Sequence, residues 1–554
     1  MNVHQLVLIG MVALPLLVAG VLVLTRGASQ PDLSGTVRWA GRLTAAAQGA
    51  GALVLLLRAV DDGPTVVQVG GWVPGVAIPL AADGFGSVVA LAVAVVVLAG
   101  LVHARGTGED RAPLLVPLVL VVQAGVNGAL FTADLFNLFV FVEIMLVPSY
   151  VLLFLGRRRT HARMDAARVY VAVNLLASTI FLAGVALVYA STGTVQLGEL
   201  AQLPRTPELD VAVWFLLLPM AFKCGAVPLH GWLPRSYAVA GPAVVAIFSG
   251  LLTKTGLVVL IRLDALLVPD GSAVAGVVLV VALLSASVGV LLAVGSKGMR
   301  AVLAAHMVSQ VGFLLAGVGL VTTLGLAASV FFLVQYVVVK AALFMVSGAV
   351  ETRYGTDELS SLGGLAHREP VLALAFALSA AALVGLPPTS GFVGKLQVLT
   401  AAVGAGAYVT VAVLVVVSLL TLTSMLKVWN GVFWGPADDA PRPLATRAAG
   451  LGAADGLGLA GPAQRDEDAR ESGTDRRGGG VGSRERGTRD DGQAPAAAAS
   501  RATRAALVGP PLVLGVVALL LGVGAEPLLA VADQAAAGLA DPGAWAAVVT
   551  GPPR

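Results

Sequence analysis

The sequence predicts an all-α, polytopic membrane protein with about fourteen transmembrane helices. Only 12% of the 554 residues are charged and 57% are hydrophobic, whereas a soluble domain carries about a quarter charged residues. Apolar runs of about 20 residues, the length of a spanning helix, recur along the chain. A water-soluble fold is therefore excluded. The net charge of +3 lies in short loops between apolar runs, which indicates membrane topology and not nucleic-acid binding.

Each predicted span is an apolar run bounded by charge, proline or glycine. The first run has no basic segment before it and is long enough to cross a bilayer, so it is predicted to be an uncleaved helix and not a signal peptide. The fourteen spans lie near residues 5–25, 39–60, 84–104, 113–131, 133–156, 166–190, 211–232, 242–264, 272–295, 300–320, 324–350, 370–404 (interrupted), 406–434 and 506–526.

The loop charges predict the orientation. Basic residues cluster after the fifth, ninth and thirteenth spans, whereas the even-numbered loops carry mainly acidic residues. Cytoplasmic loops are enriched in lysine and arginine, so the odd-numbered loops are predicted to be cytoplasmic. Because the number of spans is even, both termini are expected outside the cytoplasm. The basic residues after the fifth and ninth spans are Arg157, Arg158, Arg159, Arg163, Arg168, Lys297 and Arg300.

The spans group into units separated by changes in composition. The expected units are three N-terminal helices (1–104), two five-helix repeats (105–267 and 268–435), a linker (436–505), the last span (506–526) and an extracytoplasmic tail (527–554). The linker is rich in Gly, Ala, Arg and Asp and has no hydrophobic period. Such a segment buries too little apolar surface to offset its ordering entropy, which predicts a disordered cytoplasmic linker.

Two spans are predicted to be broken helices. Prolines surround Lys223 in the seventh span, and a Pro387-Pro388 pair precedes Lys395 in the twelfth. Discontinuous helices at corresponding positions in two halves indicate a transport site built from inverted repeats. The two breaks are five spans apart, and a repeat with an odd number of spans must be inverted.

Six ionisable side chains inside the spans are the candidate proton relay: Glu143, Lys223, Lys254, Lys340, Lys395 and His306. A charge at a helix centre costs about 2.5–3.5 kcal/mol, which favours a functional role over a structural ion pair. A desolvated lysine holds its proton less tightly, and a neighbouring carboxylate restores its hold. Separation of a Glu143–Lys223 pair would therefore pass one proton onward, for example to Lys254.

Other polar residues have simpler interpretations. For His306, a hydrogen-bonded core imidazole is as well supported as a relay. Lys427 and Arg262 lie near span ends, where long basic side chains reach the interface. Asp134 lies at the opening of the fifth span and is predicted to be a helix cap. Asn137 could polarise water near Glu143 or bond across helices.

Several chemistries are excluded. Cys224 is the only cysteine, so the chain's thiols cannot form a disulfide framework or a metal cluster. Gly-x-Gly sequences lie inside apolar spans and indicate helix packing, and no P-loop is present. The sequence therefore predicts a transporter component with no cofactor, and not an enzyme with nucleotide or redox chemistry of its own.

Five ordered motifs resemble one family. They are TADLFNLFVFVE at 132–143, KCGAVPLHGWLP at 223–234, GLLTKTG at 250–256, HMVSQVG at 306–312 and GFVGK at 391–395. Over about residues 110–435 the chain resembles the proton-conducting subunits shared by Mrp-type sodium/proton antiporters and respiratory complex I, and it looks most like the D-type subunits of the antiporters.

The resemblance implies a proton path through Glu143, Lys223, Lys254 and Lys395, with Lys340 and His306 matching further family positions. Two departures stand out. Gln335 and Tyr336 occupy the stretch where the family usually has a histidine one turn before the eleventh-helix lysine, which weakens the prediction of a titratable relay there. Arg235 stands where complex I relatives usually carry an acidic residue.

The function that the resemblance implies is exchange of protons for sodium or another monovalent cation, within a complex of several membrane subunits. One alternative is a pumping subunit of complex I or a hydrogenase-like redox complex. Another is a scaffold whose charges only hold the bundle together. The sequence leaves open which cation is moved and which residues bind it.

Overall fold

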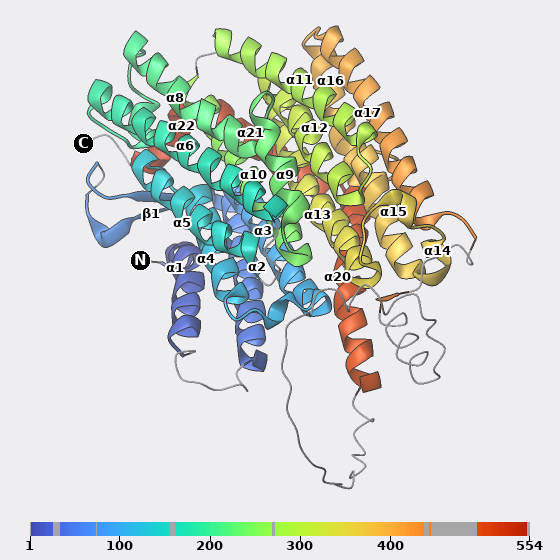
Figure 1. Cartoon of the computed structure of the whole chain (residues 1–554). Helices are drawn as coiled ribbons and strands as arrows, with labels where there is room; N and C mark the ends of the chain where they lie inside the picture. The colour runs from blue at the N-terminus through green and yellow to red at the C-terminus, as the bar shows by residue number, and fades with distance from the viewer. Residues whose placement is uncertain are drawn as a thin grey trace, which may run out of the picture.

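The computed structural model describes residues 2–25, 34–73, 75–155, 161–268, 272–436, 443–444 and 496–550. It confirms the predicted helical membrane fold, because each of the fourteen predicted spans coincides with a long helix or a broken pair of helices (Figure 1). In the described ranges, 12 helices are long and apolar enough to cross a membrane, and two shorter apolar helices accompany them.

The helices follow the predicted order. The N-terminal group is α1 (Val3–Leu24), α2 (Ser34–Asp62) and α3 (Gly84–Thr107). The next helices are α4 (Leu115–Phe131), α5 (Leu135–Phe154), α6 (His161–Thr192), the short α7 (Leu197–Leu200), α8 (Pro207–Cys224) with α9 (Trp232–Val239), and α10 (Pro242–Leu267). The second unit has α11 (Ala273–Gly295), α12 (Met299–Gly319), α13 (Thr323–Tyr354), the short α14 (Leu365–Arg368), α15 (Pro370–Val384) with α16 (Ser390–Gly404), and α17 (Tyr408–Val428). The C-terminal group is α20 (Ala496–Val523), α21 (Glu526–Ala540) and α22 (Pro542–Thr550).

Three helices form the centre of the bundle. The apolar windows of α10 and α13 are entirely buried and that of α12 is almost so, whereas α1, α11 and α17 leave most of their apolar surface exposed. Exposed apolar faces are expected where a helix contacts lipid or another subunit. Charged residues on α10, α12 and α13 therefore lie far from that outer surface.

Both predicted helix breaks are present. Helix α8 ends at Gly225 and α15 ends at Gly385, each with a positive φ that favours glycine. At the first break the Trp232 indole Nε1 donates to Phe222 O at 3.0 Å, so a side chain satisfies a carbonyl freed by the break. Irregular backbone at membrane depth requires such internal partners.

Polar caps fix where several helices begin. The Asp134 carboxylate accepts a hydrogen bond from Asn137 N at 2.7 Å at the start of α5, as the sequence predicts, and burial raises the pKa of this carboxyl. The Asn137 amide donates to Thr132 Oγ1 at 2.9 Å, which settles its role as a local bond beside the cap. Asp83 caps α3 in the same way.

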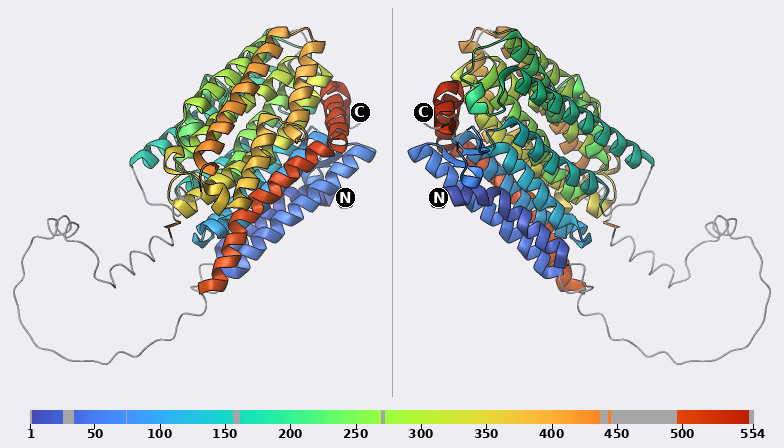
Figure 2. Two further views of the ribbon diagram at one scale, coloured as in Figure 1. Left: turned by 90° about the vertical axis from the view of Figure 1, so that its right-hand side faces the viewer. Right: turned by 90° about the vertical axis from the view of Figure 1, so that its left-hand side faces the viewer.

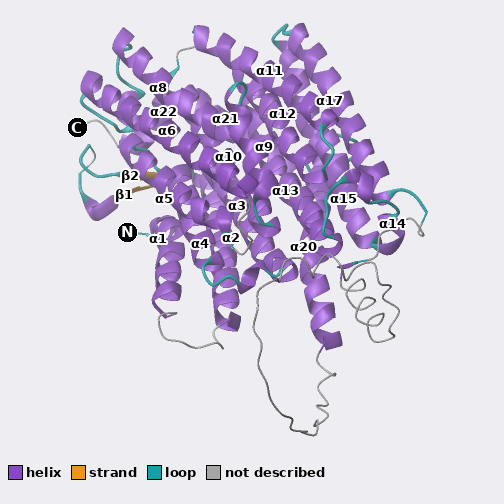
Figure 3. Cartoon of the chain, viewed as in Figure 1, coloured by secondary structure: helices purple, strands orange, loops and turns teal. Residues whose placement is uncertain are grey.

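A small antiparallel hairpin, which the sequence did not predict, joins α2 to α3 (Figure 3). Its strands are β1 (Thr65–Gln68) and β2 (Pro79–Ala82). Gln5 Nε2 on α1 donates to Val66 O at 3.1 Å, and Gln68 Nε2 donates to Val549 O on α22 at 3.0 Å. The beginning and the end of the described chain therefore lie on the same side of the bundle.

The last long helix, α20, runs beside the N-terminal helices and the second unit (Figure 2). It contacts α3, α13, α15 and α16, and α21 continues along α3 and α13. Helix α20 begins at Ala496, earlier than the predicted start near residue 506. Most of the predicted linker at 436–505 lies outside the described residues.

Candidate proton pathway

The six predicted relay residues come from six different helices. Glu143 is on α5, Lys223 on α8, Lys254 on α10, His306 on α12, Lys340 on α13 and Lys395 on α16. The four lysines and His306 are buried, with at most 5% of any of them exposed, whereas Glu143 is half-buried. A buried ammonium group needs hydrogen-bond acceptors or aromatic rings around it, and each of the four lysines has such a partner.

Glu143 and Lys223 lie close enough to interact electrostatically. In the part of the chain that the structure describes, they form no ion pair within 4.0 Å. The Lys223 ammonium instead donates to Ser178 Oγ on α6 at 3.4 Å, and Glu143 Oε1 is buried without a described hydrogen-bond partner. The pair is therefore in electrostatic range but separated, and both groups retain hydrogen-bonding capacity.

Lys223 also lies at a close approach of α8 to α10. A Cβ added at Gly256 would lie 2.8 Å from Lys223 Cβ and 3.1 Å from Cys224 N. Glycine at this position lets the two backbones touch. Lys254, two residues before Gly256, is thus carried by the helix that packs directly on the Lys223 turn.

Tyr336 lies between Lys254 and Lys340. The Lys254 ammonium is 4.0 Å from the centre of the Tyr336 ring, and the Lys340 ammonium is 5.9 Å from it. Attraction to a ring face stabilises a buried cation by about 2 kcal/mol or more. The Tyr336 hydroxyl donates to Met307 O at 3.2 Å, and Lys340 Nζ donates to Leu303 O at 2.9 Å. The Tyr336 ring therefore lies near one lysine from each of the two five-helix units, Lys254 on α10 and Lys340 on α13.

His306 lies among the lysines of the second half. Its Nε2 is 2.6 Å from Ser424 Oγ on α17, and that hydroxyl donates to Thr421 O at 2.8 Å. Because the hydroxyl proton is used, Nε2–H donates to Ser424, and Nδ1 is left as an acceptor without a described partner. His306 also interacts electrostatically with Lys340, Lys395 and Lys427. It is both a hydrogen-bonded core residue and a group within reach of three cations.

Lys395, on α16, binds across the second helix break to the end of α15. Its ammonium donates to Val384 O, the last carbonyl of α15, at 2.9 Å, and it lies 4.7 Å from the centre of the Phe313 ring. Cations are favoured at the C-terminal end of a helix, where the dipole is negative. Stacked rings of Phe313, Phe332 and Tyr336 lead from Lys395 towards Lys254.

Several buried polar atoms along this line have no described hydrogen-bond partner. They include both amide atoms of Gln310 and Oε1 of Gln335, besides His306 Nδ1 and Glu143 Oε1. Native proteins usually satisfy such atoms with ordered water. The sequence analysis did not identify Tyr336, Gln310 or Ser424 as site residues. Gln310 could have been found, because it lies one helical turn after His306 in the same motif.

The prediction that Arg262 reaches the interface was wrong. Arg262 does not reach for the interface but forms a buried two-pronged ion pair with Asp83, with N–O distances of 2.7 and 3.0 Å. Lys427 Nζ donates to three carbonyls at the end of α11, at 2.6 to 3.3 Å. The sequence could not show either result, because both partners lie on distant helices.

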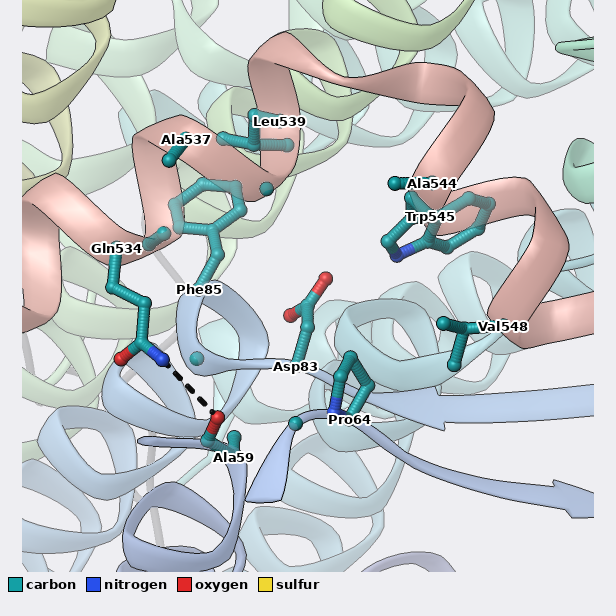
Figure 4. A pocket seen from close by; sticks show the side chains of 14 residues that line it. Ala59, Pro64, Asp83, Phe85, Gln534, Ala537, Leu539, Ala544, Trp545 and Val548 are labelled. Atoms are coloured by element: carbon teal, nitrogen blue, oxygen red, sulfur yellow. Dashed lines mark hydrogen bonds between the residues drawn. The ribbon is translucent and has the colours of Figure 1, made fainter. Parts of the chain in front are cut away.

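The Asp83 carboxylate also borders a cavity of about 340 Å³ under the C-terminal helices (Figure 4). Its side chain points between Phe85 and Trp545, and the guanidinium of Arg262 lies 5.8 and 5.7 Å from the centres of these two rings. The Gln534 amide on α21 donates to Ala59 O at 3.5 Å at the cavity edge. This cluster joins α3, α10 and the C-terminal helices.

Broken helices that carry buried lysines, with a carboxylate in electrostatic range, define the class of polytopic membrane proteins that move protons through their interior. Residues 132–421 match the family described as "NADH:quinone oxidoreductase/Mrp antiporter, TM". The chain belongs to this family.

Two relatives are similar over most of their length. The chain is 38% identical to the D-type subunit of the Na(+)/H(+) antiporter of Alkalihalophilus pseudofirmus, over 69% of this chain and 79% of the relative. A chain of the Mrp complex from a Dietzia species is 39% identical, with a TM-score of 0.85 and complete coverage of both chains. A chain of respiratory complex I from Thermus thermophilus, 24% identical with a TM-score of 0.74 over 96% of this chain and 99% of that one, shows the same fold.

Proposed function

We propose that this chain is the proton-translocating subunit of a multisubunit antiporter that exchanges sodium or another monovalent cation for protons. The observation that carries the proposal is the separated Glu143–Lys223 pair beside the Lys254–Tyr336–Lys340 cluster. The names of the relatives at 38 and 39% identity support the antiporter over a redox complex. The match to complex I lies below 25% identity and supports the fold alone.

In the first half, Glu143 controls how firmly Lys223 holds its proton. When the carboxylate is close and ionised, it stabilises the ammonium of Lys223. When the two groups separate, the ammonium releases one proton, which passes through water to the neutral amine of Lys254. Lys223 is then neutral, Lys254 is charged, and the total charge is unchanged.

In the second half, the proton passes from Lys254 to Lys340 and then to His306 and Lys395. Two ammonium groups that share one ring repel each other, so a charge on Lys254 favours release from Lys340. The free Nδ1 of His306 accepts that proton and returns it to the next amine. Lys395 completes the line at the second helix break.

The other parts of the proposal concern the surroundings of the chain. Partner membrane subunits would cover exposed apolar faces such as those of α11 and α17. Both termini would lie outside the cytoplasm, in keeping with the loop charges and with the contacts of both chain ends with one hairpin.

The test is cation-dependent proton exchange in vesicles that contain the complete complex. Lys223→Ala and Glu143→Gln are each expected to lower the exchange rate by about 100-fold or more, the usual effect of removing a positioned proton carrier. Arg168→Gln is a matched control, because Arg168 is an exposed cation that pairs with Asp165 on its own helix. If both variants assemble normally and exchange like the wild type, the charges only hold the bundle together.

A further inference from the structure

His103 is a buried ionisable residue that the proposed pathway does not use. It lies on α3 with none of its surface exposed, and its Nδ1 is 3.0 Å from Leu507 O on α20. A carbonyl oxygen can only accept, so Nδ1 carries the hydrogen and donates it. Nε2 therefore bears the lone pair of the neutral ring, and no described residue binds it. A basic nitrogen is thus free inside the bundle.

The free nitrogen points at the place where α3, α10 and α13 meet. A Cβ added at Gly348 would lie 3.4 Å from His103 Nε2 and 2.7 Å from Pro242 Cβ at the start of α10. The adjacent Ser347 is fully buried, and its hydroxyl also has no described partner. His103 and Ser347, each with a buried polar atom that has no described partner, therefore lie on two of the three helices that meet at this junction.

A cavity of about 520 Å³ lies next to this junction, at the end of the bundle that the loop charges predict to be cytoplasmic. Its lining includes Pro242, Thr107 and Thr352. Thr107 follows His103 by one helical turn, and Thr352 follows Gly348 by one turn, so the cavity begins one turn, about 6 Å along the helix axes, beyond these two residues. The Glu109 carboxylate also borders the cavity and accepts from Ala243 N and Val244 N.

On the inner side of the junction, polar groups continue towards the lysines. Ser347 and Lys340 are on the same helix, seven residues or about 10 Å apart. The Tyr237 ring contacts Phe344, between those two positions, with ring centres 5.9 Å apart. The Tyr237 hydroxyl is buried without a described partner, and Tyr237 interacts electrostatically with Tyr336.

We propose that His103 is the gate of a proton inlet from this cavity to the Lys254–Tyr336–Lys340 cluster. Three buried polar atoms, on His103, Ser347 and Tyr237, mark the route. A buried polar atom without a partner is unfavourable, so ordered water is expected beside each of them. The inference rests on the proposed function, and it adds an access point at the junction of the two repeats.

The proton balance at His103 is simple. The Nε2 lone pair accepts one proton from a hydronium ion in the cavity, which leaves water behind, and forms an imidazolium, while Nδ1–H stays bonded to Leu507 O. The same Nε2–H bond then releases the proton to water beside Ser347. The ring returns to its neutral form, and one proton has moved towards Lys340. Glu109 and Arg111 flank the route on the outer side, and Lys340 flanks it on the inner side.

The first experiment measures hydration and does not depend on transport. Ser347→Cys and Ser329→Cys place thiols on the same helix at two fully buried positions. Ser329 is the matched control, because its hydroxyl donates to Leu314 O and Gly325 O at 2.9 Å. Ag⁺, a thiol-reactive cation of about the size of water, is added to the cytoplasmic face of vesicles that carry the complete complex. Thiols that Ag⁺ has not blocked are labelled after denaturation.

The cysteine at 347 is expected to be blocked at least about tenfold faster than the cysteine at 329, a difference of about 1.4 kcal/mol in access. The wild-type chain, whose only thiol is the buried Cys224, gives the background. Equal rates at 347 and 329 would overturn the inlet, whatever the transport activity.

The second experiment measures exchange. His103→Leu is expected to lower the exchange rate at least about tenfold, whereas His4→Leu, on α1 and outside the route, should not change it. If His103→Leu fails to assemble, Ser347→Ala carries the test, because it removes a hydroxyl that has no protein partner. An unchanged rate in these variants, alongside a loss in Glu143→Gln, refutes the inlet and leaves the proposed function standing. If Glu143→Gln is also normal, the proposed function itself fails.

Discussion

The role of Tyr336 as a link between the two halves gives the sharpest prediction. The centre of the ring lies 4.0 Å from the Lys254 ammonium, and within the described residues the hydroxyl makes one hydrogen bond, to Met307 O. Tyr336→Leu removes the face, whereas Tyr336→Phe keeps it. A desolvated cation–π contact stabilises the charged lysine by about 2 kcal/mol. This corresponds to about a 30-fold change in the population of charged Lys254.

The assay is cation-dependent proton exchange in vesicles that hold the complete complex, with the amount of assembled subunit measured in parallel. We expect Tyr336→Leu to lower the rate by about 30-fold, following that loss of charged Lys254. Tyr336→Phe keeps the ring and should slow exchange by at most about tenfold, since it loses one hydrogen bond of about 0.5–1.5 kcal/mol. A leucine variant with a normal rate would refute the link. If the phenylalanine variant is as slow as the leucine variant, the hydroxyl and not the ring carries the effect.

Three further predictions concern packing and buried pairs. Gly256→Ala places a methyl group 2.8 Å from Lys223 Cβ, so it should destabilise the α8–α10 contact by about 1–3 kcal/mol. The unfolding temperature of this variant in detergent should fall. Gly276→Ala is the control: a Cβ at that position would meet no atom within 4 Å, so its unfolding temperature should not change. Arg262→Met leaves the Asp83 carboxylate buried without its cation, so it should lower the free energy of unfolding by about 3–5 kcal/mol. The double variant Arg262→Met/Asp83→Leu should recover most of the lost unfolding temperature. If it does not, the unpaired carboxylate is not the cause of the destabilisation. Ser424→Ala removes the hydrogen-bond partner of His306 Nε2, which costs about 1–3 kcal/mol, and it should slow proton exchange by about tenfold. Thr423→Val, on the exposed side of α17, is the control. An equal effect of both variants would point to helix distortion instead.

Hydrophobic runs predict most of this fold because the bilayer imposes the length of every span. All spans were placed from run length, and both breaks were found from proline and glycine beside lysine. The hairpin β1–β2 was missed because its strands have only four residues each and lie in a loop. The helical character of the C-terminal segment was also not anticipated, although α21 carries a buried face of alanine and leucine.

The candidate site was predictable residue by residue but not in its contacts. A charged residue inside an apolar run is conspicuous in the sequence, so Glu143 and the four lysines could be proposed as candidates from the sequence alone. Tyr336 did not stand out, because a tyrosine in an apolar helix is common, and its place between two lysines depends on how α10 packs on α13. For the same reason, the snorkelling prediction for Arg262 failed: its partner Asp83 lies on α3, far away in the sequence.

Helix α20 and the helices after it are held against the bundle by packing contacts, and not by the covalent connection to α17. Helix α20 packs on α3, α13, α15 and α16, and Gln68 binds the main chain of α22. We expect these packing contacts, and not the covalent connection through residues 445–495, to position this last segment. A chain cut within that interval should reassemble from two separately made pieces, and a foreign domain inserted there should leave the membrane bundle in register.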